Sequence, residues 1–185
     1  MAWTAPFTAV AGSVFQAAQF NTYVRDNLNQ TAPALATTPG SIFAVTGTNS
    51  IAERTPSLTG DAAQVDITST TFADPATGSP GPSVTVTCGV NALVGYRATL
   101  RVASTTARVE MSYAISGATS RSSSTTRSVG YSVSNNASGT GLNLRAGVVD
   151  LATQLTPGSN TFKLEYNVSS GTGQAIDRRI WVLPL

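Results

Sequence analysis

The sequence predicts a mainly β protein: an antiparallel jelly-roll or β-sandwich body, preceded by a short N-terminal α-helix and an extended arm. After Pro39, apolar and polar residues alternate in short segments, and Gly, Pro, Asn and Ser separate these segments. Charged residues make up only 11% of the chain, and 27 threonines and 21 serines supply much of its polarity. Hydroxyl-rich, charge-poor sequences of this kind suit strands and tight turns.

The predicted strands follow one another from residue 64 to the end of the chain, after a small hairpin at 41–54. We expect them at 64–68, 83–88, 92–102, 109–115, 129–133, 142–153, 162–168 and 176–183. Between them, 74–82 reads as a Pro/Gly loop and 116–127 as a hydroxyl-rich loop that is mobile or lies in an interface. The closing strand is apolar on both faces, with Ile180 and Val182 on one and Trp181 and Leu183 on the other, which predicts a subunit interface there.

One segment has a convincing helical period. Ala17, Phe20, Val24 and Leu28 recur at steps of three and four, so we expect a helix from about 16 to 29 with these residues on one face. Pro33 should end the helix, and residues 31–40 read as a semi-rigid linker. The predicted domains are therefore 1–40 (arm, helix and linker) and 41–185 (β body), with 41–55 as an alternative separate hairpin.

Residues 1–16 are apolar but have no helical period, so they are predicted to form an extended arm. A free end with so many aromatic and aliphatic side chains would be a sticky surface. The arm therefore either packs back on the β body or docks into a neighbouring protein, and docking is the favoured interpretation. The candidate anchoring interface comprises the large apolar residues of the arm and of the helix face: Trp3, Phe7, Val14, Phe15, Phe20, Val24 and Leu28.

The sequence offers no recognisable catalytic or metal-binding motif. It has no histidine, which excludes Ser-His-Asp machinery and His-ligated metals, and a single cysteine, Cys88, which we expect in the core. The nine carboxylates are spread singly, although two could still meet in a groove in space. We therefore predict a protein that is not an enzyme and has no metal or cofactor.

The charge and hydropathy patterns exclude two classes of partner. The net charge is only +2, and the basic residues are scattered over predicted strands with no run interleaved with aromatics, so no nucleic-acid partner is expected. No apolar run approaches the ~18 residues of a membrane span. The N-terminus also lacks the pattern of a signal peptide.

Several stretches resemble virion structural proteins of tailed phages with actinobacterial hosts, a group of minor tail, fibre-like or head-decoration proteins. The resemblance lies in 3–6, 9–14 and the helix 17–28, and more loosely in 111–119, 155–162 and 178–185, so it covers most of the chain. One departure is Gln16, where the family pattern has a helix-capping Thr. The resemblance implies a structural component of the virion, assembled in the bacterial host cytoplasm, with no catalytic residues to carry over. The body is also similar in pattern to the trimeric jelly rolls of tumour-necrosis-factor type.

These observations predict a non-enzymatic virion surface protein, anchored through its arm and helix, with a homotrimeric β body that projects outward. Its partners would be copies of itself and a capsid or tail protein, and minor tail protein, tail fibre and capsid decoration all stay open as roles. The alternative is a carbohydrate- or receptor-binding module that stacks a host surface glycan on Trp181, Tyr131 or Tyr166. A third hypothesis is a cell-wall hydrolase with two carboxylates converging in a groove.

Overall fold

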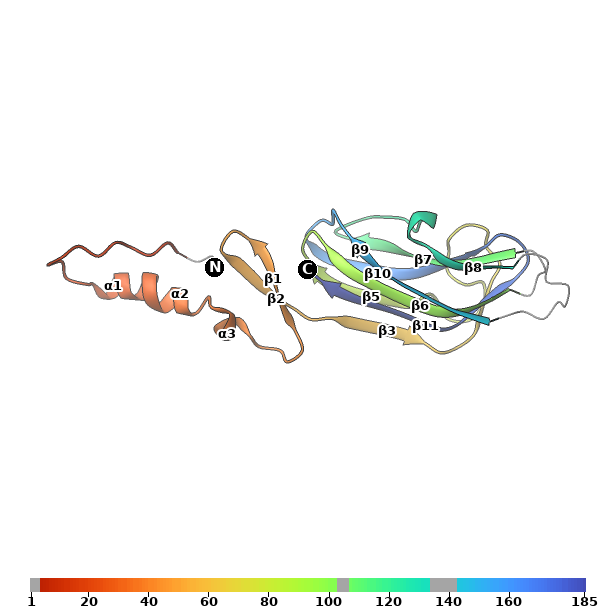
Figure 1. Cartoon of the computed structure of the whole chain (residues 1–185), viewed down its shortest axis with the longest axis horizontal. Helices are drawn as coiled ribbons and strands as arrows, with labels where there is room; N and C mark the ends of the chain where they lie inside the picture. The colour runs from red at the N-terminus through yellow and green to blue at the C-terminus, as the bar shows by residue number, and fades with distance from the viewer. Residues whose placement is uncertain (1–3, 103–106, 134–142) are drawn as a thin grey trace. The chain divides into compact units, whose positions relative to one another are not determined.

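The computed structural model describes residues 4–102, 107–133 and 143–185 (Figure 1). The chain divides into two compact units, Met1–Thr55 and Pro56–Leu185. This division groups the hairpin with the N-terminal residues, and each unit is described by itself below.

The N-terminal unit holds one helix, a single further helical turn and a hairpin. The helix consists of α1 (Ala17–Phe20), a π-helical turn η1 (Asn21–Arg25) and α2 (Asp26–Leu28). A short helix α3 (Ala32–Leu35) follows, and then the hairpin of β1 (Ile42–Gly47) and β2 (Ser50–Arg54). The expected linker is thus partly helical: Pro33 lies in the first turn of α3, where its missing N–H costs no hydrogen bond.

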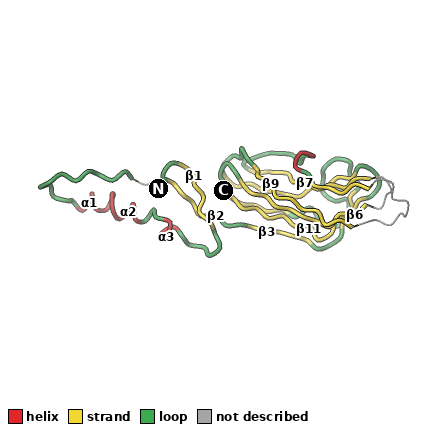
Figure 2. The backbone as a smooth tube through the Cα atoms, in the orientation of Figure 1, coloured by secondary structure: helices red, strands yellow, loops and turns green. Residues whose placement is uncertain are grey.

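The second unit is built almost wholly of antiparallel strands (Figure 2). A short 3-10 helix, η2 (Thr125–Arg127), interrupts the strands. The strands are β3 (Ser57–Asp61), β4 (Val65–Ile67), β5 (Ser83–Cys88), β6 (Ala92–Val102), β7 (Ala107–Gly117), β8 (Val129–Val133), β9 (Asn143–Ala152), β10 (Gly158–Val168) and β11 (Gly173–Pro184). The sequence missed β3, whose Ser-Leu-Thr-Gly-Asp stretch has one large apolar residue and is strand only because it pairs along the edge of β11.

The strand pairing of this second unit is nested: its first strand pairs with its last, and the strands nearest the middle of the unit pair with each other. β3 pairs with β11, β5 with β10, β6 with β9 and β7 with β8. Further pairing of β11 with β6 and of β10 with β7 gives two sheets, β3-β11-β6-β9 and β5-β10-β7-β8, with β4 added to β11. This rolled-up antiparallel order is that of a jelly roll. The predicted fold class, a jelly-roll sandwich after a short N-terminal helix, is confirmed.

The core lies between the two sheets, where alternate residues of each strand point inward. Cys88 is buried there as expected and accepts a hydrogen bond from Asn160 Nδ2 at 3.2 Å. The largest fully buried apolar side chains of the described residues are Tyr113, Tyr166, Phe162, Ile67, Leu100, Met111, Leu164 and Ile180. The apolar alternation that predicted the strands is therefore the alternation that fills the core.

The hydroxyl-rich loop after β7 is bonded to its own sheet and is not the mobile segment that was one of two expectations, whereas its part in an interface stays a prediction. Arg121 and Ile115 form an isolated antiparallel bridge, and the Ser112 hydroxyl donates to the Ser124 carbonyl at 3.0 Å. The Ser123 hydroxyl donates to Glu165 at 2.7 Å. Serine hydroxyls are short enough to bond backbone groups directly, so they hold this loop against β7 and β10.

A β-bulge in β11 turns one arginine into the core. The register of β11 against β6 shifts between Ile176 and Arg179, where Asp177 has a φ of 49°. As a result Arg178 points inward and is 0% exposed, and its Nη2 lies 2.6 Å from Asp61 Oδ2. Arg178 also donates to the carbonyls of Ser79 and Pro80, both at 3.2 Å. The buried guanidinium therefore ties the 74–82 loop to the edge strand β3.

Hydrogen bonds keep Asp61 ionised in the folded protein. The Ser79 hydroxyl, the Ala63 N–H and the Arg178 charge lower the pKa of Asp61 below its usual 3.8. The stabilisation is present above pH 3.8 and is lost as the pH falls through the lower, folded-state value.

We predict that Arg178→Ala lowers the free energy of unfolding by about 3 kcal/mol. The variant removes the buried guanidinium that pairs with Asp61 and leaves the carbonyls of Ser79 and Pro80 without this donor. Denaturant unfolding of the body would measure this. The matched control is Arg179→Ala, one residue further on and facing solvent, which should cost less than about 1 kcal/mol. Equal losses in the two variants would show that the inward arginine does not hold the loop.

Candidate functional site

The extended arm is bonded to the helix through the side chain of Asn27. Its Nδ2 donates to the carbonyls of Thr4 at 2.9 Å and Tyr23 at 3.0 Å, and its Oδ1 accepts from Thr4 N at 2.9 Å. The amide thus pairs with the Thr4 backbone as a neighbouring strand would, and Asn27 is buried. The sequence reasoning missed this role, although Asn27 lies inside the stretch that carries the family resemblance.

Aromatic contacts extend the packing between arm and helix. The rings of Phe7 and Phe15 are stacked at 5.2 Å, and Phe7 also lies 5.2 Å from Tyr23 on the helix. Phe15 meets Phe20 edge-on at 6.1 Å. The arm therefore packs on its own helix, and this contact leaves much of its apolar surface uncovered, so docking into a neighbouring protein stays a prediction.

The π-helical turn explains which helix face the arm covers. A π turn holds one extra residue, so the residues after it are rotated relative to a regular 3.6-residue period. The face toward the arm is Tyr23 and Asn27, whereas Phe20 is 48% exposed and Leu28 60% exposed. The predicted apolar face of Phe20, Val24 and Leu28 is thus largely unpartnered within the described chain. At the start of the helix, the Gln19 side chain accepts a hydrogen bond from Gln16 N at 3.0 Å, which is the half of a capping box that the third helical residue supplies.

The predicted anchoring residues fall into three groups. Trp3 lies outside the described residues. Phe7 is half-buried against Tyr23, and Val24 is also half-buried. The others are exposed, Val14 to 84%, and they present an apolar surface: Val14, Phe15, Phe20 and Leu28.

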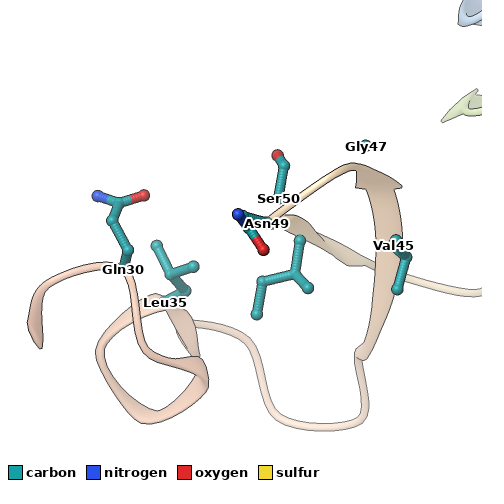
Figure 3. A pocket seen from close by; sticks show the side chains of 7 residues that line it. Gln30, Leu35, Val45, Gly47, Asn49 and Ser50 are labelled. Carbon is teal, nitrogen blue, oxygen red and sulfur yellow. The ribbon is translucent and has the colours of Figure 1, made fainter. Parts of the chain in front are cut away.

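The hairpin adds further exposed apolar residues to the same unit. A hollow of about 360 Å³ lies between α3 and the turn of the hairpin, lined by Gln30, Leu35, Val45, Gly47, Asn49, Ser50 and Ile51 (Figure 3). Leu35 points into it from α3, and Val45 lies on β1. Its walls are mainly apolar, so the hollow would accept an apolar side chain of a partner.

The N-terminal unit buries very little of its own apolar surface. Ala44 is its one buried apolar residue among those described, and Asn27 its one buried polar residue. Eight of the 14 exposed large apolar residues of the described chain lie in this 55-residue unit. They are Val10, Val14, Phe15, Phe20, Leu28, Ile42, Phe43 and Val45. Such a density of exposed apolar side chains marks an interaction surface.

Glu53 fixes the segment between α3 and the hairpin. It accepts hydrogen bonds from Thr37 Oγ1 at 2.5 Å and Thr38 N at 2.7 Å. These bonds, the Thr37 hydroxyl first, lower the pKa of Glu53 below its usual value. The 36–40 segment is therefore tied to β2 rather than free.

The outer face of the β3-β11-β6-β9 sheet grades from apolar to basic along the strands. At one end, Leu183, Leu93 and Leu151 face one another across β11, β6 and β9. The next row is Leu58, Trp181, Gly95 and Val149, and the row after it is Gly60, Arg179, Arg97 and Gly147. Beyond these rows lie Arg145 and Arg101. This apolar end lies on the outer face of the closing strand, where the subunit interface expected from the sequence stays a prediction.

Two glycines let long side chains lie across this face. A Cβ at position 95 would sit 2.0 Å from Trp181 Cε2, so the indole ring occupies the space above Gly95. A Cβ at position 60 would sit 2.8 Å from Arg179 Cγ. Because glycine has no side chain, Trp181 and Arg179 can each lie flat against the strand next to their own.

The aromatic residues proposed for sugar stacking are placed differently from one another. Tyr166 is 0% exposed, and burial raises the pKa of its hydroxyl. Tyr131 is half-buried against the core. Trp181 alone among the three faces outward on the sheet, where Leu58 lies opposite it.

A polar cluster lies between β7 and β9. Tyr113 donates to Asp150 Oδ2 at 2.6 Å, and its ring packs edge-on against Tyr96 at 5.6 Å, with Arg127 5.2 Å above it. Burial, and then the Asp150 charge, raises the pKa of Tyr96 to about 12 and that of Tyr113 further. Both phenols are therefore neutral donors at physiological pH, and Tyr96 bonds the Arg127 carbonyl. This arrangement stabilises the edge of the sandwich.

Three carboxyl groups, Glu53, Asp61 and Asp74, have lowered pKa values, the direction opposite to that of a glycosidase's general acid. A general acid requires a raised carboxyl pKa. Hydrogen bonds lower the pKa of Glu53 and Asp61, and at Asp74 burial is outweighed by the Lys163 and Gly81 donors, so its pKa is lowered too. Among the described residues there is no group of three or more Cys, Asp or Glu that could hold a metal ion, and no helix there is long and apolar enough to cross a membrane.

The sequence matches no family model and no curated protein. In fold, the chain is similar to the VP2 subviral particle of infectious bursal disease virus, with a TM-score of 0.42 and 11% identity over 78% of this chain. It is also similar to the T=1 particles derived from the same virus, with a TM-score of 0.38 and 14% identity over 82% of this chain. The match spans 38% and 40% of those chains. The assignment of the fold therefore rests on the nested strand pairing, which defines a jelly-roll protein with an apolar N-terminal unit.

We predict that Asn27→Leu releases the arm from the helix, because the Asn27 side chain makes both hydrogen bonds that join Thr4 of the arm to the helix. Loss of such bonds is worth roughly 1–3 kcal/mol, so amide exchange in residues 4–15 should accelerate at least about tenfold, measured by mass spectrometry. The neighbouring exposed Asn29→Leu is the control and should leave exchange unchanged. Unaltered exchange in Asn27→Leu would mean that the aromatic contacts hold the arm alone.

Proposed function

We propose that this protein is a non-enzymatic structural component of a phage virion, anchored through its N-terminal unit, with the jelly-roll body projecting outward. The observation that carries the proposal is the imbalance between the two units. The body encloses a filled core, whereas the N-terminal unit leaves eight large apolar residues in solvent. A unit that cannot bury its own apolar surface gains stability by docking onto another protein.

The anchoring surface is the apolar helix face together with the adjoining arm. Phe20, Val24 and Leu28 supply the helix part, and Val14 and Phe15 the arm part. The Asn27 pairing holds arm and helix together, so the surface is largely formed before docking and little ordering entropy is lost. The resemblance of 17–28 to phage virion proteins supports a capsid or tail protein as the partner, and minor tail, fibre-like and capsid-decoration roles all fit this anchor.

We further propose that the body associates into a homotrimer through the apolar end of its outer sheet face. Leu93, Leu151 and Leu183 form this end, and Leu151 is 50% exposed. Short apolar rows of this kind are stabilised when a second copy covers them. The Ser/Thr-rich surface of the opposite sheet would then face outward.

We predict that Phe20→Ser/Leu28→Ser lowers the copy number of the protein in virions at least about tenfold, because two exposed anchors lose their apolar contacts. Deletion of residues 1–30 should abolish incorporation and leave a folded, oligomeric body. Quantitative mass spectrometry of purified particles gives the copy number, and Thr22→Ala on the same helix is the control. Normal incorporation of the deletion variant would refute the anchor.

We predict that Leu151→Arg converts the trimer to monomers, since a charge placed in each contact must be desolvated without a partner. Light scattering on the size-fractionated protein measures the mass. Thr87→Arg, an exposed position on β5 of the other sheet, adds the same charge and should leave the mass unchanged. A stable monomer in the unmodified protein would refute the trimer.

A further inference from the structure

From the outer face of the β3-β11-β6-β9 sheet we infer a binding site for an anionic saccharide, centred on Trp181, Arg97 and Arg179. A hollow of about 560 Å³ lies over these residues, within the usual range of ligand pockets. Each of the four strands lines it: Leu58 from β3, Arg179 and Trp181 from β11, Arg97 from β6, and Gly147 and Val149 from β9.

The hollow combines an apolar floor with guanidinium groups. Trp181 lies over Gly95 and borders the hollow beside Leu58 and Val149. The C–H face of a sugar ring packs on an indole and on aliphatic side chains of this kind. Arg97 and Arg179 offer planar arrays of N–H donors that match carboxylate or phosphate oxygens as well as hydroxyls. The two kinds of surface meet within one hollow, which fits a ligand that is both a sugar and an anion.

The arginines here carry more charge than the chain neutralises. Asp177 is the one carboxylate that they share, at 2.8 Å from Arg145, 3.1 Å from Arg179 and 3.8 Å from Arg97. Arg101 lies four residues beyond Arg97 along β6, on the same face. The cluster therefore keeps a positive excess that attracts an anion.

A second copy of this chain does not offer the complementary charge. All nine carboxylates accept a hydrogen bond or ion pair from within the chain: Asp26, Glu53, Asp61, Asp66, Asp74, Glu110, Asp150, Glu165 and Asp177. Five of them pair with a cation, and the other four bond neutral donors and lie apart, since no three carboxylates come together in the described part of the chain. Another copy would therefore offer single carboxylates and not an acidic patch that matches this cluster of arginines. The apolar row of Leu93, Leu151 and Leu183 lies on the other side of Trp181, so a copy can contact that end and leave the hollow open.

The face also lacks the features of a nucleic-acid track. A single-stranded nucleic acid follows a long positive groove with several stacking aromatics. Here the charge is confined to a few rows, and the sheet beyond Trp181 is apolar. Of the two aromatic residues that line the hollow, Tyr96 is buried and Trp181 faces outward. The geometry fits one or two sugar units.

The test uses the full chain with Trp3→Phe, which leaves Trp181 as the sole indole, since the sequence has two tryptophans. The fluorescence of Trp181 and its quenching by acrylamide are followed at low salt. The probes are tetragalacturonate, glucose 1,6-bisphosphate, neutral maltotetraose, tetraglutamate and an oligothymidylate. The first two probes distinguish a carboxylate from a phosphate as the preferred anion.

We expect at least one of the two anionic sugars to shield Trp181, with an affinity at least about tenfold above that of maltotetraose. Arg97→Gln/Arg179→Gln should weaken that binding at least about tenfold. Arg25→Gln/Arg108→Gln removes the same charge from exposed arginines elsewhere and should change the affinity less than about twofold. Both double variants should keep the thermal midpoint of the unmodified protein.

Four results would overturn the site. Equal binding of maltotetraose would show that the site does not select for a negative charge. Equal binding of tetraglutamate would show that it does not select for a sugar ring. Tighter binding of oligothymidylate would identify a nucleic-acid surface. Shielding of Trp181 that rises with protein concentration alone would show that a second copy covers the face. Because binding is measured on the isolated protein and anchoring on virions, either proposal can fail without the other.

Discussion

The arrangement of the body depends on one backbone constraint, the bulge at Asp177 in the closing strand. Side chains in a strand alternate between faces, so an extra residue exchanges the faces of everything that follows it. With the bulge, Arg178, Ile180 and Val182 face the core, and Arg179, Trp181 and Leu183 face outward. Asp177, in the left-handed region, then bonds Arg145 and Arg179 on the outside.

The bulge therefore links the interior of the body to its outer surface. Inside, Arg178 holds the 74–82 loop to β3 through Asp61 and Ser79. A fully buried arginine is tolerated because its two Nη atoms find a carboxylate, a hydroxyl and two carbonyls. Outside, the same strand presents a tryptophan and an arginine in successive rows, so the apolar and basic parts of the face adjoin each other.

The two units differ in how much of their own apolar surface they bury. The nested pairing of the jelly roll encloses two inward faces, and sheet hydrogen bonds pair each of its nine described strands with at least one neighbour. The N-terminal unit has one helix and one hairpin, too little chain to enclose a core. Its arm covers one helix face through Asn27 and leaves the face of Phe20 and Leu28 exposed. Docking onto another protein would bury that face, which is the physical basis of the proposed anchoring role.

The sequence by itself determined what local periodicity encodes: the helix near 17–28, most strands of the body, and the double apolar faces of the closing strand. It also indicated an under-buried N-terminal segment, since aromatic content is visible without a fold. Only the tertiary structure decided which residues meet. Four features join positions that are distant in sequence or shifted by a bulge or π turn. They are the pairing of β3 with β11, the hydrogen bonds of Asn27 with Thr4, the ion pair of Arg178 with Asp61, and the hollow that Trp181 and Arg97 both line. A one-residue shift changes the face of a side chain while leaving the composition of its segment the same, so residue patterns alone do not reveal it.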